Sequence, residues 1–261
     1  MSEGDATRAR VRGTMKSMGE LGSSAGKAAS GPRVAFFGGS FDPPHRGHLA
    51  VARAARVGLD LDEVLFAPVG AQPLKPLGST ASFEDRLAMT RLAIAGELGF
   101  SVSLADAPRA DDVPNYTLET LLGLRSRLPP GSFLFLLMGA DSFLGLRGWH
   151  RAAEIPFAAP LIVASRPGEL LDDLKTSLPE GLAMEGELKV VGGEAGVEVR
   201  SCLLTNRAGE RTPFYLLPGL NVEASASQIR ERARQDPGGA DEWKLLPGTV
   251  AAYIRERGLY R

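Results

Sequence analysis

Short apolar runs alternate with amphipathic segments along most of the chain. The segments between the runs show the spacing of apolar residues that is typical of helices, and a last such segment spans 245–261. A strand followed by a helix, repeated several times, builds a parallel sheet with helices on both faces. We therefore predict an α/β fold, a doubly wound parallel sheet with C-terminal helices, whose strands lie at 34–37, 63–68, 100–104, 133–138 and 161–164.

The stretch from Val34 to Ala52 carries the most informative pattern. It reads VAFFGGSFDPPHRGHLAVA: an apolar run, two glycines, a proline-containing turn and the start of a helix near Arg46 or Gly47. Gly38 and Gly39 allow a tight turn and a close approach of the backbone to a ligand. The free N–H groups at the start of the helix face this turn and attract anions, which indicates a phosphate site.

Two of the three histidines in the chain, His45 and His48, follow this turn. Residues three apart on a first helical turn project from the same side, so both imidazoles can touch one anion. Gly47 leaves room between them. A single histidine is usually a satisfied structural residue, but a pair behind a glycine turn indicates phosphate chemistry.

The string GGSFDPPHRGH resembles the HxGH signature of the nucleotidyltransferase superfamily, in its nicotinate-nucleotide adenylyltransferase form. The patterns GxxxxGK[ST] and GxGxxG do not follow the strand. The resemblance implies a Rossmann-like nucleotidyltransferase fold. It also implies adenylyl transfer from ATP to nicotinate mononucleotide, giving nicotinate adenine dinucleotide and pyrophosphate in NAD biosynthesis, with Mg²⁺ carried on ATP and no metal site of the protein's own.

The resemblance assigns roles to several residues. His45 and His48 hold the reacting phosphates, and ATP lies against the residues that share their turn, Gly38, Gly39, Ser40, Phe41 and Gly47. Lys75, in a proline-bounded loop after the second strand, either serves the phosphates as in the family or is a solvated charge. Arg166, after the strand at 161–164, either contacts a phosphate or forms a surface pair.

A second signature of the superfamily, commonly Ile-Ser-Ser-Thr-x-Ile-Arg, resembles residues 224–230. Three positions agree with it, Ser227, Ile229 and Arg230, whereas Ala224 and Ala226 depart from it. A helix start with a hydroxyl and an arginine suits the outer phosphates of ATP. We therefore expect the three agreeing residues at the ATP site, with Arg230 on the triphosphate.

Three residues bear on the acceptor. Thr117 belongs to an Asn-Tyr-Thr string where the family has Ser-Tyr-Thr, and by resemblance its backbone N–H faces the pyridine ring. Trp149 is either a core anchor or a flat platform for a heteroaromatic ring, and the family arrangement favours the platform. His150 replaces an expected tyrosine, but a contact made by its backbone N–H survives that exchange.

Polar residues also follow the third and fourth strands. Gly139 permits a close approach of ATP, and Asp141 either binds ribose hydroxyls or caps the next helix. Asp106, Asp111 and Asp112 have neither His nor Cys beside them, so we interpret their loop as solvated rather than metal-binding.

Two packing helices are expected in the middle of the chain. Ser82 is a plausible N-cap for the first, whose apolar stripe we predict to be Phe83, Leu87, Leu92 and Ile94. Asn115 is the expected N-cap of the second helix.

The segment at 169–216 is longer than the link that the resemblance to the family leads us to expect. We interpret it as an inserted segment with a β-hairpin around Ala208-Gly209 that serves as an oligomer contact, a lid or decoration.

Composition sets further limits on function. The 261 residues carry a net charge of -1, so no nucleic-acid partner is indicated, and the apolar runs are too short to span a membrane. The single cysteine, Cys202, excludes an intrachain disulfide and makes the cytoplasm the default location. Residues 1–31 are rich in Gly, Ser, Ala and Arg, and we predict a disordered tail rather than a transit peptide. The oligomeric state is left open.

Two alternatives remain at this point. The phosphate-binding residues do not distinguish between possible acceptors. The acceptor is therefore nicotinate mononucleotide, nicotinamide mononucleotide or pantetheine phosphate. In another class, the altered second signature and the long segment at 169–216 suit a nucleotide-sensing domain that binds without turnover.

Overall fold

The computed structural model describes residues 31–70, 78–110, 113–165, 171–192, 196–220, 225–235 and 243–261. The chain divides into two units, Met1–Ser30 and Gly31–Arg261. All described residues belong to the second unit. Apart from Gly31, the tail that we predict to be disordered lies outside the described residues, so that interpretation stays a prediction.

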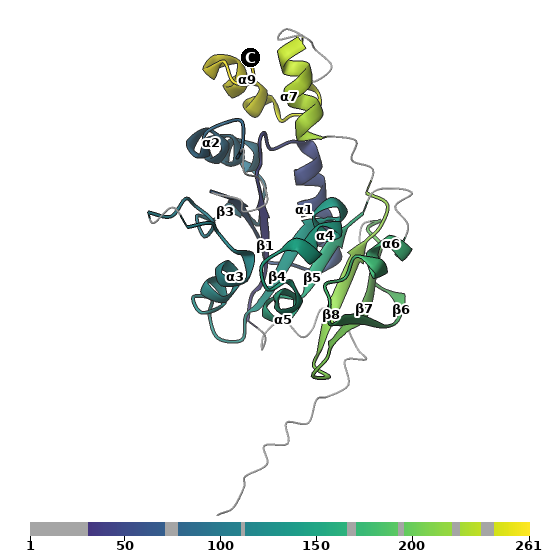
Figure 1. The fold of residues 1–261 in the computed structure, drawn as a ribbon. Helices are drawn as coiled ribbons and strands as arrows, with labels where there is room; N and C mark the ends of the chain where they lie inside the picture. Colours follow the sequence, from purple (N-terminus) through teal and green to yellow (C-terminus); the bar gives the residue numbers. More distant parts are fainter. Residues whose placement is uncertain are drawn as a thin grey trace, which may run out of the picture. The chain divides into compact units, whose positions relative to one another are not determined.

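One eight-stranded sheet runs through the second unit, in the order β3-β2-β1-β4-β5-β8-β7-β6 (Figure 1). From β3 to β8 each strand pairs in parallel with its neighbour, and β7 and β6 continue the sheet in antiparallel pairs. The predicted parallel sheet is therefore confirmed, with an antiparallel extension at one edge. The strands are β1 (Arg33–Gly39), β2 (Glu63–Pro68), β3 (Phe100–Val102), β4 (Phe133–Gly139), β5 (Leu161–Ala164), β6 (Leu182–Gly192), β7 (Val199–Asn206) and β8 (Arg211–Leu217).

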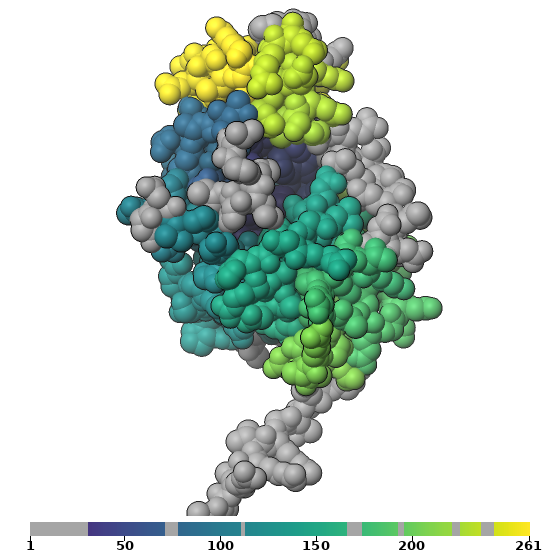
Figure 2. All heavy atoms as spheres, in the orientation of Figure 1, coloured from purple at the N-terminus to yellow at the C-terminus, as the bar shows by residue number. Residues whose placement is uncertain are grey.

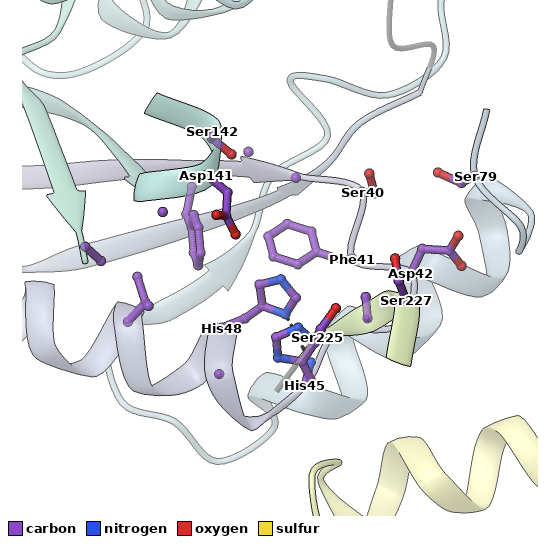
Figure 3. Close-up of a pocket in the computed structure, with 18 of the residues that line it drawn as sticks. Ser40, Phe41, Asp42, His45, His48, Ser79, Asp141, Ser142, Ser225 and Ser227 are labelled. Carbon is purple, nitrogen blue, oxygen red and sulfur yellow. Dashed lines mark hydrogen bonds between the residues drawn. The ribbon is translucent and has the colours of Figure 1, made fainter. Parts of the chain in front are cut away.

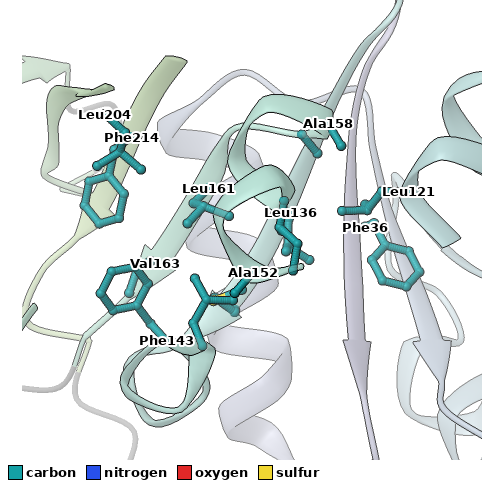
Figure 4. Packing of buried hydrophobic residues seen from close by; sticks show 14 of the residues in the cluster. Phe36, Leu121, Leu136, Phe143, Ala152, Ala158, Leu161, Val163, Leu204 and Phe214 are labelled. Carbon is teal, nitrogen blue, oxygen red and sulfur yellow. The ribbon is translucent and has the colours of Figure 1, made fainter. Parts of the chain in front are cut away.

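Helices cover both faces of this sheet (Figure 1). One face carries α1 (Arg46–Gly58), which packs on Phe37 and Leu137. The other carries α3 (Thr117–Arg125), α4 (Ala140–Leu144) and α5 (Ile155–Ala158), with the short 3-10 helices η1 (Leu146–Gly148) and η2 (Ala152–Glu154) between α4 and α5. Figure 4 shows this second core, where Phe143 and Phe214 meet near Leu161. Coverage of both faces explains why the central strands are continuous apolar runs.

A third group of buried residues joins α2 (Phe83–Ile94), α7 (Ala226–Gln235) and α9 (Gly248–Arg257). Figure 2 shows their atoms side by side, α2 in blue, α7 in yellow-green and α9 in yellow. We call this group the C-terminal cluster, and its members include Met89, Ile229, Leu246, Val250, Ile254 and Tyr260. It is a hydrophobic core separate from the two that cover the sheet.

The buried face of α2 differs from the predicted stripe. Ser82 caps the helix as expected and accepts a hydrogen bond from the N–H of Asp85 at 3.0 Å. Of the predicted stripe, Ile94 is buried and Leu92 is partly buried against the C-terminal cluster. The prediction was wrong for Phe83 and Leu87, which are partly exposed, whereas Arg86 and Met89 are buried. The reason is that α2 packs against α9 as well as the edge of the sheet, so polar groups near its start are enclosed too.

The segment at 169–216 contains more structure than the predicted hairpin. The hairpin itself is formed by β7 and β8, with the Asn206 side-chain oxygen accepting the N–H groups of Ala208 and Glu210 at 3.0 Å each. The sequence analysis missed α6 (Leu171–Thr176) and β6. Most side chains of β6 are exposed, so its sequence lacks the apolar alternation that would have revealed a strand.

No helix in the described ranges is long and apolar enough to cross a membrane. No group of three His, Cys, Asp or Glu side chains in the same ranges is arranged to hold a metal ion.

Candidate active site

Two adjoining cavities open where β1 and β4 end, at the point where the strand order reverses direction. Ligands of open α/β sheets bind at such switch points. The first cavity has a volume of about 480 Å³ and lies against α1 and α7, and the second has about 650 Å³ and lies against α3. Both volumes are typical of small-molecule sites. The cavities are continuous, since both are lined by Gly38, Gly39, Ser40, Asp141 and Ser142.

His45 and His48 lie together on the wall of the first cavity (Figure 3). His45 is the N-cap of α1 and His48 belongs to its first turn. Their ring centroids are 3.7 Å apart, with the planes inclined by 26°. The backbone N–H of His45 donates to Nδ1 of His48 at 3.1 Å. The structure thus brings both predicted histidines to one site.

The hydrogen bond to Nδ1 determines what His48 offers a ligand. Because Nδ1 accepts, the proton of the neutral ring resides on Nε2. Desolvation by burial holds the pKa of His48 well below its usual range, and the neighbouring His45 lowers it further. Near pH 7 His48 is therefore a neutral ring that presents Nε2–H as a donor.

Aromatic rings from β1, β2 and the turn support the His48 imidazole. The ring of Phe41 meets it edge to face at 5.0 Å between centroids, and Phe37 lies at 6.1 Å. Phe66 of β2 packs behind both phenylalanines, at 5.6 Å from Phe41 and 5.3 Å from Phe37. These apolar neighbours account for the desolvation that keeps His48 neutral.

Gly38 and Gly39 are the last residues of β1, so the predicted turn at these glycines was wrong. The chain turns at Phe41, whose φ of 47° is left-handed. A Cβ on Gly38 would lie 2.9 Å from Cε1 of Phe36, and one on Gly39 would lie 3.3 Å from Cζ of Phe41. The glycines are needed for space beside aromatic rings, and their bare backbone forms part of the cavity wall.

The second signature reaches the first cavity from α7. Ser225, Ser227 and Arg230 line it, and Nη2 of Arg230 donates to Oγ of Ser227 at 3.2 Å. The expectation that Ile229 contacts ATP is corrected here, because its side chain is only 2% exposed and packs in the C-terminal cluster. Ile229 therefore anchors the helix that carries Ser227 and Arg230.

Gly139 lines the first cavity, and Asp141 lines both cavities. Gly139 is the N-cap of α4, and a Cβ on it would meet no atom within 4 Å, so the space beside it is open to a ligand. Asp141 lies in the first turn of α4 and its exposed side chain lines both cavities. Since Gly139 occupies the cap position, Asp141 does not cap this helix, and its carboxylate lies on the wall that the two cavities share.

The second cavity collects the three predicted acceptor residues. Thr117 is the first residue of α3, Trp149 is half-buried, and His150 is exposed with its ring 4.5 Å from that of Tyr116. The prediction that Asn115 caps α3 was wrong, because Tyr116 holds the cap position. The side-chain amide of Asn115 instead donates to the carbonyl of Ala107 at 3.1 Å.

Asp106 also lines the second cavity, and the interpretation of its loop as solvated was wrong at this residue. Its side chain is buried and accepts a hydrogen bond from the Thr120 hydroxyl at 2.5 Å. Desolvation raises the pKa of Asp106, and the bond from Thr120 opposes part of that shift. The signal that was available is position, since Asp106 follows a strand whose carboxyl end points at the site.

The remaining predicted residues fall in two groups. Gly47 is buried in the first turn of α1 and lines the first cavity, where it leaves space beside the histidines. Lys75 and Arg166 lie outside the described residues, as do Asp111, Asp112 and Ala224. Their assignments stay predictions.

Comparison with known proteins identifies the family. Residues 36–232 match the family model described as cytidylyltransferase-like. A curated protein of Gloeobacter violaceus, described as "Probable nicotinate-nucleotide adenylyltransferase", is 38% identical over 231 residues, which are 88% of this chain and 97% of the relative. The chain belongs to the nicotinate-nucleotide adenylyltransferase family. A member from Aeromonas hydrophila with the same description is 39% identical over 230 residues, covering 88% of this chain and 98% of its own.

Solved structures confirm the nucleotidyltransferase fold of this family member. The Plasmodium falciparum nicotinic acid mononucleotide adenylyltransferase, solved in complex with APC, superposes with a TM-score of 0.61 at 15% identity and covers 88% of this chain and 97% of its own. The structure of the same enzyme complexed with NaAD superposes with a TM-score of 0.61 at 16% identity. At such low identity the likeness bears on the fold alone.

Proposed function

We propose that this chain transfers the adenylyl group of ATP to nicotinate mononucleotide, giving nicotinate adenine dinucleotide and pyrophosphate. The observation that carries the proposal is the stacked pair His45–His48 at the wall of a cavity that also contains Ser227 and Arg230 and is continuous with an aromatic-lined second cavity. The family membership established by its relatives points to the same reaction.

The reaction requires alignment more than proton transfer. An oxygen of the acceptor phosphate attacks the α-phosphorus of ATP, a new phosphorus–oxygen bond forms, and the bond from the α-phosphorus to the bridging oxygen breaks as pyrophosphate leaves. The attacking phosphate is already ionised and needs no general base. Catalysis then comes from positioning and from stabilising the negative charge that develops on the α-phosphate and the leaving group.

In this reaction the two histidines contact the reacting phosphates. The neutral His48 ring donates from Nε2, and a donor fixed in a site poor in water is worth more than the same group in bulk solvent. Arg230, together with Ser227, faces the outer phosphates from α7. By the resemblance to the family, Lys75, which lies outside the described residues, also serves the phosphates. The first cavity is therefore the ATP site, with Gly38, Gly39, Ser40, Phe41 and Gly139 as its walls.

Mg²⁺ enters as part of the substrate, bound to the triphosphate. The residues that line the first cavity fit this role, because Arg230 and Ser227 would hold the phosphates that carry the ion and the exposed carboxylate of Asp141 lies on the same wall. Mg²⁺ commonly retains waters and uses substrate phosphates as ligands.

The acceptor occupies the second cavity. Its pyridine ring stacks on Trp149, and the backbone N–H groups of Thr117 and His150 point at the ring substituent. Its phosphate then reaches the first cavity across Gly38 and Gly39, which line both. We assign this reaction to the cytoplasm, the location in which a chain with a single, unpaired cysteine is expected.

Pyrophosphate release with a panel of acceptors tests the proposal. Purified protein is incubated with Mg²⁺ and ATP, and with nicotinate mononucleotide, nicotinamide mononucleotide or pantetheine phosphate. We expect the highest kcat/KM with nicotinate mononucleotide and the formation of nicotinate adenine dinucleotide in equal amount to pyrophosphate. If ATP binds but none of the acceptors leads to release of pyrophosphate, the protein is instead a nucleotide-sensing domain.

A further inference from the structure

The turn that carries the histidines has a strained backbone. We call residues 40–48 the histidine turn. Phe41 within it has a φ of 47°, a left-handed value that a bulky residue rarely adopts. Such a conformation is strained and persists only where surrounding contacts hold it.

Asp42, the residue after Phe41, anchors the turn through its hydrogen bonds. Its side chain is 4% exposed, and both carboxylate oxygens accept hydrogen bonds. Oδ2 accepts the N–H of Thr80 at 2.6 Å, and Oδ1 accepts the N–H of Ala81 at 3.2 Å and the hydroxyl of Tyr260 at 2.7 Å. The backbone carbonyl of Asp42 accepts Nη1 of Arg230 at 2.6 Å. Asp42 therefore links the turn to three distant parts of the chain.

Tyr260 brings the C-terminal cluster into this network. It is the next-to-last residue of the sequence, is 5% exposed and packs in that cluster. Its own φ is 66°, which is left-handed like the φ of Phe41, the residue before Asp42. Burial and the bond to Asp42 raise the pKa of Tyr260, so its hydroxyl keeps its proton and acts as the donor.

Further bonds tie the same cluster to the turn. The buried Arg86 of α2 donates from Nη1 to the carbonyl of Ser40 at 2.8 Å. The N–H of Arg46, at the start of α1, donates to the carbonyl of Leu245 at 2.8 Å. Arg230 reaches the ATP cavity from α7 while bonded to Asp42. The cluster thus sets both the shape of the histidine turn and its distance from the α7 side of the cavity.

We propose that Tyr260 is a positioning residue for adenylyl transfer, whose hydroxyl holds the Asp42 carboxylate and so ties the C-terminal cluster to the histidine turn. This inference rests on the function proposed above. Tyr260 acts through Asp42, and it is not among the described residues that line either cavity. Its effect is therefore on the placement of His45, His48 and Arg230 rather than on contact with a substrate.

The chain contains a matched control. Tyr253 of α9 packs on the same cluster and donates its hydroxyl to Oδ1 of Asp85 at 2.9 Å, the same chemistry as Tyr260 on Asp42. Asp85 lies in the first turn of α2 and is absent from the described lining of both cavities. Tyr253→Phe therefore removes a tyrosine–aspartate hydrogen bond from the cluster, at a less buried position, without touching the histidine turn.

The test compares Tyr260→Phe with Tyr253→Phe in steady-state kinetics and thermal unfolding. Both retain their rings, so we expect folded proteins with modest losses of Tm, the larger one in Tyr260→Phe because its hydrogen bond is buried. Tyr260→Phe should lower kcat by about 10-fold to 100-fold, with a smaller change in KM for either substrate, because misplaced phosphate donors cost most in the transition state. Tyr253→Phe should keep kcat within about twofold. Equal kcat for the two variants would overturn the proposal.

A second variant covers the case in which Tyr260→Phe fails to fold. Asp42→Asn retains an acceptor oxygen and should show the same selective loss of kcat. Where both single variants fold, the kcat of the double variant should be no lower than the kcat of the less active single variant, because the two residues act through one hydrogen bond. Additive losses would contradict the linkage.

A readout without turnover separates this inference from the proposed function. Amide hydrogen exchange at residues 40–48 should be faster in Tyr260→Phe than in the wild type and unchanged in Tyr253→Phe. An inactive wild type would reject the proposed reaction while the exchange data still decide the linkage. Unchanged exchange in Tyr260→Phe would reject the linkage even in an active enzyme.

Discussion

His45 donates its backbone N–H to the side chain of His48 while the two imidazole rings stack 3.7 Å apart. The first bond fixes which nitrogen of His48 carries the proton, and the stacking discourages protonation of both rings together. A motif with two histidines thus yields one neutral, oriented donor at the wall of the ATP cavity.

Replacing His48 should remove turnover while leaving the fold intact. His48→Ala is expected to lower kcat by roughly 10²-fold or more, comparable with the loss of one oxyanion donor. His48→Gln should recover part of the rate, because its amide can present an N–H near the position of Nε2. Kinetics combined with circular dichroism check this, and an unchanged kcat in folded His48→Ala would exclude the role.

Stability should depend on pH through His48. Its pKa is lower in the folded state than in the unfolded chain, so the unfolded state binds more protons as pH falls. The free energy of unfolding should therefore decrease as pH drops through about 6.5, the value for an unperturbed histidine. Tm measured from pH 8 to pH 5.5 should fall less steeply for His48→Gln than for the wild type and His150→Gln, which retain His48. Parallel curves for all three proteins would contradict this account.

The second cavity should favour the acid form of the pyridine nucleotide. Backbone N–H groups at Thr117 and His150 suit a carboxylate, and charge-assisted hydrogen bonds of about 1.5–3 kcal/mol correspond to roughly a 10-fold to 150-fold preference in kcat/KM over the amide. His150→Tyr should preserve this ratio because backbone groups make the contacts. Trp149→Ala should weaken binding of both forms. Equal kcat/KM values for the two mononucleotides would contradict the assignment of this acceptor pocket but would not contradict adenylyl transfer.

Arg86 should be a large contributor to stability among the charged residues of α2. It is 2% exposed and donates to the carbonyls of Ser40 and Ala81, which Arg86→Met would leave without this donor. We expect a loss of about 2–4 kcal/mol in the free energy of unfolding. Arg91→Met, an exposed position on the same helix, should change it by less than about 0.5 kcal/mol. Chemical denaturation of both variants measures the difference, and similar values would show that these buried bonds contribute little.

Removing the predicted N-terminal tail should have little effect. Its composition cannot support a core, so a chain beginning at Gly31 is expected to keep the Tm and the activity of the full-length protein. A loss of several degrees in Tm would show that the tail docks on the rest of the chain.

The central sheet was predictable because its strands are buried on both faces. The runs at 63–68 and 161–164 coincide with β2 and β5, since coverage by helices selects continuous apolar residues. By contrast, β6 exposes most of its side chains at the edge of the sheet, and nothing in its residue pattern distinguishes it from a loop.

The histidines of the site were predictable because their spacing is local. Asp42 is part of the same string, yet its role was not predictable, because its partners Thr80 and Tyr260 are 38 and 218 residues away in the chain. For Ile229 the sequence predicted a role in the site that the structure does not support. This residue matches a signature in the sequence, but its side chain serves the C-terminal cluster rather than the cavity.

The hairpin between β7 and β8 offers a place for labelling. Because β8 runs parallel to β5, its carboxyl end lies at the edge of the sheet that holds the cavities, and the tip around Ala208 lies at the opposite edge. The single native thiol, Cys202, is buried and its pKa is raised to about 11 by desolvation, so it reacts poorly near neutral pH. Ala208→Cys would therefore introduce one reactive thiol at an exposed tip. A fluorophore or a surface tether attached there leaves the entrance to both cavities free, which permits single-molecule recording of nucleotide binding in the working enzyme.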